Sequence, residues 1–300
     1  MLKIAFHPIY KHPLPKGHRF PMEKYELLPQ QLIYEGTCTP DNFFEPEIPN
    51  NKYFFMVHDP EYVSDLLNIT LSHKEARKIG FPLSEELIAR EQIIADGTIK
   101  ASTYALQYGI AMNIAGGTHH AFTNRGEGFC MLNDQAIGAR YLLEHGLASK
   151  ILIVDLDVHQ GNGTAEIFQN EPAVFTFSMH GKTNYPFHKE ESDLDIHLEN
   201  ETGDDEFLSI LKSTLSRLIK EQKPDFIYYL CGVDVIASDK LGKLSLSLEG
   251  CKERDRFVLQ SCYDAQIPVM CSMGGGYSED IKIIVEAHAN TFRLAQDIFF

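Results

Sequence analysis

The sequence predicts an α/β fold in which a central, mostly parallel sheet carries helices on both faces, in a single domain spanning residues 1–300. Short apolar runs typical of buried strands alternate with longer helical stretches, as successive βαβ units require. The chain has 300 residues, 44% hydrophobic and 23% charged, which suffices for one large core. No repeat, low-complexity tract or linker divides it.

The strand candidates are short apolar runs, and the helix candidates lie between and after them. The strand candidates are Leu2–Phe6, Tyr53–Val57, Ala111–Ile114, Ile151–Asp157, Ala173–Ser178, Phe226–Leu230 and Pro268–Ser272. The helix candidates are Pro21–Ile33, Pro60–Leu67, Ser84–Tyr108, Asp134–His145, Asp204–Glu221, Leu248–Ala265 and Ser278–Gln296. Two long segments, Glu35–Asn51 and His180–Gly203, are expected to form loops that frame the mouth of a pocket.

The composition narrows the function classes. A formal net charge of −15 argues against broad nucleic-acid binding, which requires a basic face. The acidic balance suits attraction of lysine-rich peptides or polyamines, or it is simply a solvated surface, and we favour the second interpretation. The N-terminus lacks the features of an export signal, and no run reaches the roughly 18 apolar residues of a membrane helix. We therefore expect a cytoplasmic protein without nucleic-acid or membrane partners.

The six cysteines include no Cys-x-x-Cys pair, so the sequence does not support a structural zinc site or a redox disulfide motif. Cys231 and Cys271 lie in apolar, strand-like runs. We expect both to be buried thiols.

The first motif with chemical meaning follows the strand candidate Ala111–Ile114. In the run Gly116–His120, two glycines precede adjacent histidines, which can place two imidazoles at the carboxyl end of that strand. A carboxylate beside an imidazole would fix its tautomer and raise its pKa, whereas an amide would not. The alternative is an ordinary polar loop.

The most informative run is Ile151–Gly163. It begins as a β-branched apolar strand and then carries Asp155, Asp157 and His159 at alternate positions, which share a face on a strand. Glycines then end the strand, and Thr164 is expected to cap a helix. Because ligands of open α/β sheets bind at the carboxyl edge, the three groups predict a divalent-metal site. The alternative is a buried acidic strand end satisfied by helix-capping hydrogen bonds.

Two later strand candidates end in further polar groups. The run Cys231–Asp234 places another carboxylate at the same edge, although an aspartate there can also cap the next turn. In the run Gly274–Tyr277, three glycines let the backbone pass close to a neighbour and can present the tyrosine hydroxyl to the crevice. The alternative is a plain glycine turn with a surface tyrosine.

Taken in this order, the four motifs resemble those of the zinc-dependent histone deacetylase superfamily, from near the N-terminus to the helix after Tyr277. The continuation Gln160-Gly161-Asn162-Gly163 is most similar to class IV histone deacetylases and their bacterial relatives. The resemblance implies the arginase/deacetylase fold, with a sheet of about eight strands.

The resemblance also implies a catalytic site at the matching positions. Zn²⁺, with Fe²⁺ as the alternative, is held by Asp157, His159 and Asp234, an open ligand set typical of catalytic metals. His119 and His120 form the tandem pair, and Tyr277 donates a hydrogen bond to the substrate carbonyl. Asp155 orients His119, and Asn162 lies beside His120.

Two further sets of residues follow from the resemblance. A structural monovalent cation, K⁺ or Na⁺, is implied at Asp155, Asp157, His159, Ser178 and the backbone of Met179. The substrate tunnel is implied at Gly128 and Phe129, with Tyr185 or Phe187 on the opposite wall, and Arg19 is implied on an inner cavity.

The chain departs from the family pattern at two places. Many members have an aspartate where this chain has Asn162, and an amide stabilises an imidazolium less well, so His120 is more easily kept as a neutral base. Many members also carry a rim aspartate that clamps the peptide backbone, where this chain reads Ile79-Gly80-Phe81-Pro82. We therefore expect weaker peptide clamping and room for a greasier or smaller substrate.

The predicted function is hydrolysis of acetyl or longer acyl groups from lysine side chains or related N-acyl amines, by a metal-activated water. A catalytically silent acyl-lysine binding module is one alternative, but it would have lost a metal ligand or the tyrosine. A two-manganese ureohydrolase is another, but it needs additional aspartates where this chain has Gln160-Gly161 and Asp234-Val235-Ile236. The sequence predicts no particular oligomeric state.

Overall fold

Eight strands form one sheet in which every neighbouring pair runs parallel, in the order β2-β1-β3-β8-β7-β4-β5-β6. The computed structural model describes all residues from 1 to 300. The strands are β1 (Lys3–Ala5), β2 (Phe43–Phe44), β3 (Ile110–Asn113), β4 (Ile151–Asp155), β5 (Val174–Gly181), β6 (Leu194–Leu198), β7 (Phe226–Leu230) and β8 (Val269–Ser272). The predicted α/β class is therefore confirmed, with a sheet that is entirely parallel.

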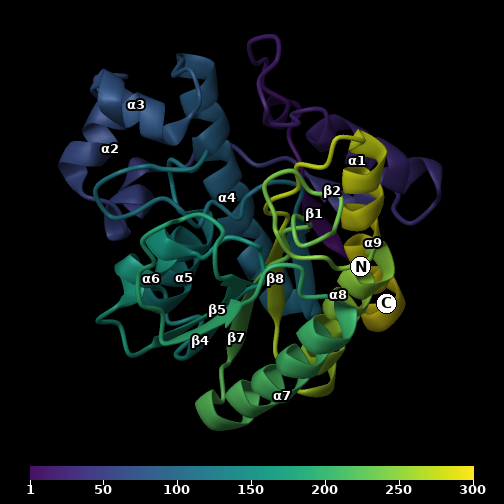
Figure 1. The fold of residues 1–300 in the computed structure, drawn as a ribbon. Coiled ribbons are helices and arrows are strands. Elements are labelled where there is room, and N and C mark those ends of the chain that lie inside the picture. The colour runs from purple at the N-terminus through teal and green to yellow at the C-terminus, as the bar shows by residue number, and fades with distance from the viewer.

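Helices cover both faces of this sheet. They are α1 (Lys24–Tyr34), α2 (Pro60–Leu67), α3 (His73–Ile79), α4 (Glu85–Tyr108), α5 (Asp134–Glu144), α6 (Asn162–Phe168), α7 (Asp204–Gln222), α8 (Leu248–Asp264) and α9 (Ile281–Phe299). Figure 1 shows α4, α5 and α6 on one side of the sheet and α1, α7, α8 and α9 on the other. None of these helices has the length and apolar character needed to cross a membrane.

The central strands are buried on both faces, which explains why they appear in the sequence as unbroken apolar runs. Every residue of β3, β4, β7 and β8 is buried. One continuous cluster of 76 buried hydrophobic residues connects the sheet with both helical layers. A single core of this kind agrees with a single domain.

One predicted strand is wrong. The segment Tyr53–Val57 belongs to a 3₁₀ helix, Asn51–Met56, whose first turn is capped by the Asn50 side chain accepting a hydrogen bond from the Lys52 N–H. Only Phe54 is fully buried within this helix. The row of aromatic residues predicts a strand, but the capping side chain of Asn50 favours a helical turn at this place.

Several other elements differ from the prediction. The two predicted loops each contain a short strand, β2 and β6, at opposite edges of the sheet. Helix α3 was not predicted, and it begins with a reciprocal capping pair between Ser72 and Glu75. Helix α6 begins at Asn162, so Thr164 lies inside it and does not cap it. The Thr164 hydroxyl instead accepts a hydrogen bond from Asn133.

Candidate active site

Three potential metal ligands meet at the carboxyl edge of two neighbouring strands, β4 and β7. Asp157 and His159 follow β4, and Asp234 follows β7; all three are buried, with ligand atoms within 4.8 Å of one another. His159 Nδ1 lies 3.0 Å from Asp157 Oδ1 and 3.2 Å from Asp234 Oδ2. Because β4 ends at Asp155, two of the ligands lie in the following turn and not on the strand as predicted.

The hydrogen bonds to the carboxylates of Asp157 and Asp234 leave one carboxylate oxygen without a donor. Asp157 accepts hydrogen bonds from the backbone N–H groups of His159 and Gly275, and Asp234 Oδ1 accepts one from Val158. Asp234 Oδ2 is buried and has no hydrogen-bond donor in suitable geometry. An unpartnered buried carboxylate oxygen is costly, and a cation would satisfy it. This donor set suits Zn²⁺ or Fe²⁺.

The protonation behaviour of Asp234 and His159 agrees with a cation site. Burial, together with the charge of Asp157, raises the pKa of Asp234 to about 7. Burial alone would lower the pKa of His159, but its hydrogen bond to Asp157 and the negative charge of Asp234 close to its ring raise it to about 10. Two buried carboxylates thus require positive charge between them.

Two glycines make room for these carboxylates. A Cβ on Gly275 would lie 2.7 Å from Asp157 Oδ2 and still closer to Asp234 Oδ2. A Cβ on Gly232 would lie 2.8 Å from Asp157 Cγ. Ordinary carbon contacts lie at about 3.5–4.0 Å, so any side chain at Gly275 would displace the ligands.

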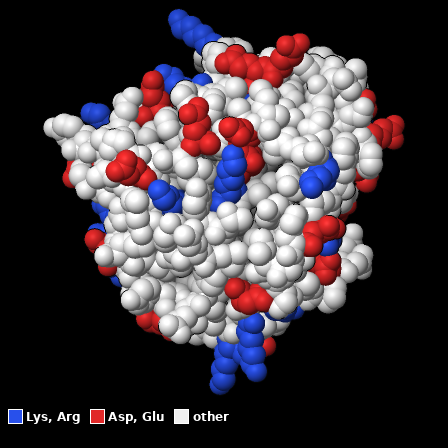
Figure 2. Space-filling view, turned by 180° about the vertical axis from the view of Figure 1, so that it is seen from behind, with Lys and Arg blue, Asp and Glu red and all other residues white.

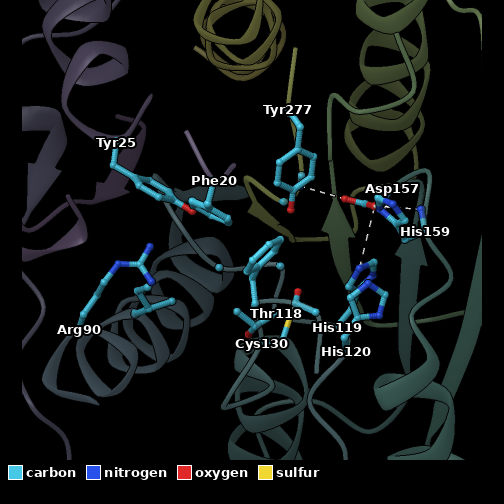
Figure 3. Close-up of a pocket in the computed structure, with 17 residues that line it drawn as sticks. Phe20, Tyr25, Arg90, Thr118, His119, His120, Cys130, Asp157, His159 and Tyr277 are labelled. Carbon is cyan, nitrogen blue, oxygen red and sulfur yellow. Dashed lines mark hydrogen bonds and ion pairs between the residues drawn. The ribbon is translucent and has the colours of Figure 1, made fainter. Parts of the chain in front are cut away.

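The tandem histidines lie beside this triad, on the loop that follows β3 (Figure 3). Their ring centroids are 4.1 Å apart. His119 Nδ1 is 2.7 Å from Asp155 Oδ2, and His120 Nδ1 is 2.6 Å from Asn162 Oδ1. The structure therefore brings together the two residue pairs that the family resemblance implies.

The two histidines differ in charge because their partners differ. Burial opposes protonation of both, but the adjacent Asp155 carboxylate outweighs it and raises the pKa of His119. For His120, burial and the nearby imidazoles of His119 and His159 lower the pKa well below 6.5. A neutral His120 that donates through Nδ1 to Asn162 has Nε2 free to accept a proton.

The buried side chain of Asp134, which the sequence did not identify as a functional residue, holds the loop that carries His119 and His120. Asp134 Oδ1 accepts hydrogen bonds of 2.9 Å from the N–H groups of Gly117 and Thr118, and Asp134 Oδ2 accepts one from Ser272. Gly116 and Gly117 both have positive φ, which glycine adopts without strain. At the start of α5, Asp134 appeared in the sequence only as a residue of the first turn.

Tyr277 closes the opposite side of the pocket. Its ring centroid lies 6.5 Å from that of His159, and its backbone N–H donates to Asp239 Oδ2. Burial and the nearby carboxylates of Asp234 and Asp157 raise the pKa of Tyr277 well above 10. The phenol therefore stays protonated and can act as a hydrogen-bond donor.

A cavity of about 340 Å³ leads from the surface to these groups. Gly128 and Phe129 form one wall, and Phe129 has the left-handed φ of 69°. Tyr185 forms the other wall, with its ring 4.9 Å from that of His120 and its hydroxyl donating to Glu127. Phe187 also lines the cavity but is 86% exposed, at its mouth. Of the two candidates for this wall, Tyr185 is therefore the one that lies deep in the cavity.

The inner-cavity assignment of Arg19 is wrong. Arg19 is exposed and lines the outer cavity, with its guanidinium 5.0 Å from the Phe129 ring centroid. The arginine on the small inner pocket is Arg90, which lies in α4 and is buried (Figure 3). It pairs with Glu91, and its Nε donates to the Tyr10 carbonyl. The sequence gives no signal for Arg90 beyond that of a charged residue inside a long predicted helix.

The residues implied for a monovalent cation belong to two neighbouring strands, β4 and β5, and to the turn after β4. Asp155 on β4 and Ser178 on β5 are register partners on adjacent strands. Met179, the next residue of β5, is buried. Asp155 Oδ1 accepts the N–H of Asp157. The Ser178 hydroxyl is hydrogen bonded to His180 Nδ1 at 2.9 Å. The set is contiguous, and its ion remains a prediction.

Residues 18–292 match the family model described as the histone deacetylase domain. The chain is 45% identical to an uncharacterized protein of Picosynechococcus over 99% of both chains. It is 31% identical to the acetoin utilization protein AcuC of Staphylococcus aureus, over 87% of this chain and 73% of that protein. It is 26% identical to histone deacetylase 2 of Arabidopsis thaliana, over 93% of this chain and 74% of that protein.

Solved structures agree in fold. The crystal structure of a histone deacetylase homologue from Aquifex aeolicus superposes with a TM-score of 0.83 at 23% identity, covering 97% of this chain and 82% of that one. The predicted arginase/deacetylase fold is thereby confirmed. On the match of the family model over most of its length, the chain belongs to the histone deacetylase family.

Proposed function

We propose that this protein is a metal-dependent deacylase that removes acetyl or longer acyl groups from lysine side chains or related N-acyl amines. The observation that carries the proposal is the buried Asp234 Oδ2, which accepts no hydrogen bond and lies close to Asp157 and to His159, a residue that lines the cavity. A neutral imidazole and a protonated phenol lie at the same place. Family membership supports deacetylase chemistry in general.

The metal we propose is Zn²⁺, with Fe²⁺ as the alternative, held by Asp157, His159 and Asp234. When bound, the ion supplies Lewis-acid polarisation of the amide carbonyl and lowers the pKa of a water molecule. Two carboxylates and one imidazole leave coordination positions open, as a catalytic site requires.

The surrounding side chains would accept and donate the protons of the hydrolysis. His120 Nε2 is free to accept the proton of the attacking water and to return one to the leaving amine. His119, held by Asp155, supplies positive charge beside it. The Tyr277 hydroxyl would donate a hydrogen bond to the carbonyl oxygen as negative charge develops on it. The apolar Phe129 and Tyr185 rings would hold the acyl-lysine stem.

The structure disfavours the two alternatives. A silent binding module would lack a ligand or the tyrosine, but Asp157, His159 and Tyr277 line one pocket, and Asp234 lies within 4.8 Å of the first two. A second metal would need further carboxylates, but Gln160 is hydrogen bonded to Glu190 and Asp195, and Val235 and Ile236 are buried in the core.

Three finer points remain predictions from the family resemblance. These are the closeness to class IV enzymes, the structural K⁺ or Na⁺, and the cytoplasmic location. None of them is required for the deacylase proposal.

The proposal is tested by assaying the zinc-loaded protein on lysine peptides acylated with chains of increasing length, and on acetylputrescine. We expect release of the free acid from at least one acyl-lysine peptide, and loss of this activity on chelation with recovery on adding zinc. Inactivity on the whole panel with metal bound would favour the binding module. Activity on guanidino compounds with two manganese ions would favour the ureohydrolase.

A further inference from the structure

The mouth of the substrate cavity carries positive charge. Arg19, Lys78 and Lys243 line it, and no aspartate or glutamate does. They come from three separate parts of the chain: the segment before α1, the last turn of α3, and the loop that follows β7. Their positions at one opening are therefore a product of the fold and not of a local basic run.

Two of these three cations have no carboxylate partner. The Arg19 guanidinium makes no hydrogen bond or ion pair and only stacks near the Phe129 ring. Lys243 Nζ donates to the carbonyl and hydroxyl oxygens of Thr183, both at 3.1 Å. Both charges are thus available to a bound molecule at the opening.

The third cation at the mouth, Lys78, is only partly neutralised. Lys78 Nζ lies 3.6 Å from Glu127 Oε1, but that carboxylate also accepts hydrogen bonds from Arg125 and Tyr185. One carboxylate is therefore shared between two cations. The nearby Asp239 is committed to the backbone N–H groups of Leu241, Gly242 and Tyr277.

This local sign is opposite to that of the whole protein, whose formal net charge is −15. On the face shown in Figure 2, acidic and basic side chains are interspersed, with no continuous field of either sign. At the cavity mouth, by contrast, the charged lining residues are all cationic, so these are the charges nearest to the substrate residues beside the acyl-lysine. At physiological ionic strength, charges beyond roughly 8 Å are largely screened, so the near groups decide selectivity.

We infer that this mouth selects acyl-lysines flanked by acidic residues, and that Arg19 and Lys243 are the specificity-determining side chains. The inference rests on the proposed deacylase function and names its substrate class. Carboxylates next to the acyl-lysine would pair with the two free cations, whereas lysine-rich segments and polyamines would be repelled. Lacking a rim carboxylate, the chain would use substrate charge instead of a backbone clamp to hold the peptide.

The test compares three peptides in which the same acyl-lysine is flanked by aspartates, by serines or by lysines. For the zinc-loaded protein at low salt, we expect kcat/KM to be about 3- to 10-fold higher for the acidic than for the neutral peptide, and lower by a similar factor for the basic one. The differences should shrink toward 1-fold in 0.5 M salt, because exposed charges are screened (~3 Å screening length near 1 M).

Substitutions identify the residues responsible. The double variant Arg19→Gln, Lys243→Gln should bring the ratio of kcat/KM between the acidic and the basic peptide, both measured on that same variant, close to 1. Lys220→Gln removes an exposed charge at the far end of α7 and should keep the wild-type ratio.

The outcomes separate the inference from the function beneath it. Turnover of all three peptides at equal rates, or a preference for the basic peptide, would overturn the charge selection and leave the deacylase intact. A preference unaffected by the double variant would overturn the assignment to Arg19 and Lys243. Inactivity on every peptide with zinc bound would overturn the proposed function and the inference with it.

Discussion

Replacing Gly275 with alanine is expected to weaken metal binding strongly without unfolding the protein. The new Cβ would lie 2.7 Å from Asp157 Oδ2 and closer still to Asp234 Oδ2, whereas ordinary contacts lie at about 3.5–4.0 Å. Gly275 also donates its N–H to Asp157 Oδ2 at 2.9 Å. Neither carboxylate can retreat freely, because both are buried among other ligands and backbone groups.

The expected size of the effect follows from what is displaced. Losing a group that only orients a metal ligand typically weakens binding by 10- to 100-fold. Gly275→Ala displaces two ligands themselves, so we expect zinc affinity to fall by more than about 100-fold. The assay is a competitive zinc titration against a chromophoric chelator, with bound metal measured by elemental analysis and folding checked by circular dichroism.

The matched control is Gly203→Ala at the start of α7, where the added Cβ would meet only the Ser245 carbonyl oxygen at 3.9 Å. This variant should bind zinc as the wild type does. If Gly275→Ala also bound zinc at full stoichiometry and affinity, the deduction that the two carboxylates are fixed in place by the glycine would be refuted.

Three other predictions address the neighbouring groups. Tyr277→Phe should lower kcat by about 10²–10³-fold, the typical cost of one oxyanion donor, with metal content unchanged; unaltered turnover would exclude the role of the phenol. Asn162→Asp should raise the pKa of His120 and move the acid limb of the kcat/KM profile upward by about one to three pH units; an unmoved limb would argue against His120 as the base. Burial lowers the pKa of His58 to about 4, so the unfolded chain takes up this proton near pH 6.5 and the folded chain does not. Stability should therefore fall as the pH drops below 6.5, by about 2 kcal/mol more from pH 7 to 5 in the wild type than in His58→Gln, measured by urea unfolding; equal losses would refute this.

The central strands, and the site motifs that follow them, could be predicted because each is recognisable from a short stretch of sequence. A strand buried on both faces must be apolar throughout, and β4 and β7 satisfy this over their whole lengths. The edge strands could not be predicted in this way. β6 alternates apolar and polar residues in the sequence Leu-Asp-Ile-His-Leu, and β2 has two residues.

Buried charges in helices were missed for a different reason. Lys24 is fully buried at the start of α1, where its Nζ donates to the Gly274 carbonyl and lies 5.6 Å from the Tyr277 ring centroid. Arg90 is paired with Glu91, and its guanidinium lies 5.0 Å from the centroid of the Tyr25 ring in α1. A single sequence shows only a charged residue in a helix, which is usually solvated, because the partners come from distant segments.

The measurement that tests the central claim most directly is the zinc stoichiometry of the metal-free protein and of its Asp234→Asn variant. The claim is that Asp157, His159 and Asp234 hold one divalent ion. It predicts one tightly bound zinc per wild-type chain, and binding weakened by at least about 100-fold in the variant, because one of three ligands loses its charge. No tight binding by the wild type, two ions per chain, or equal affinity in the variant would contradict it.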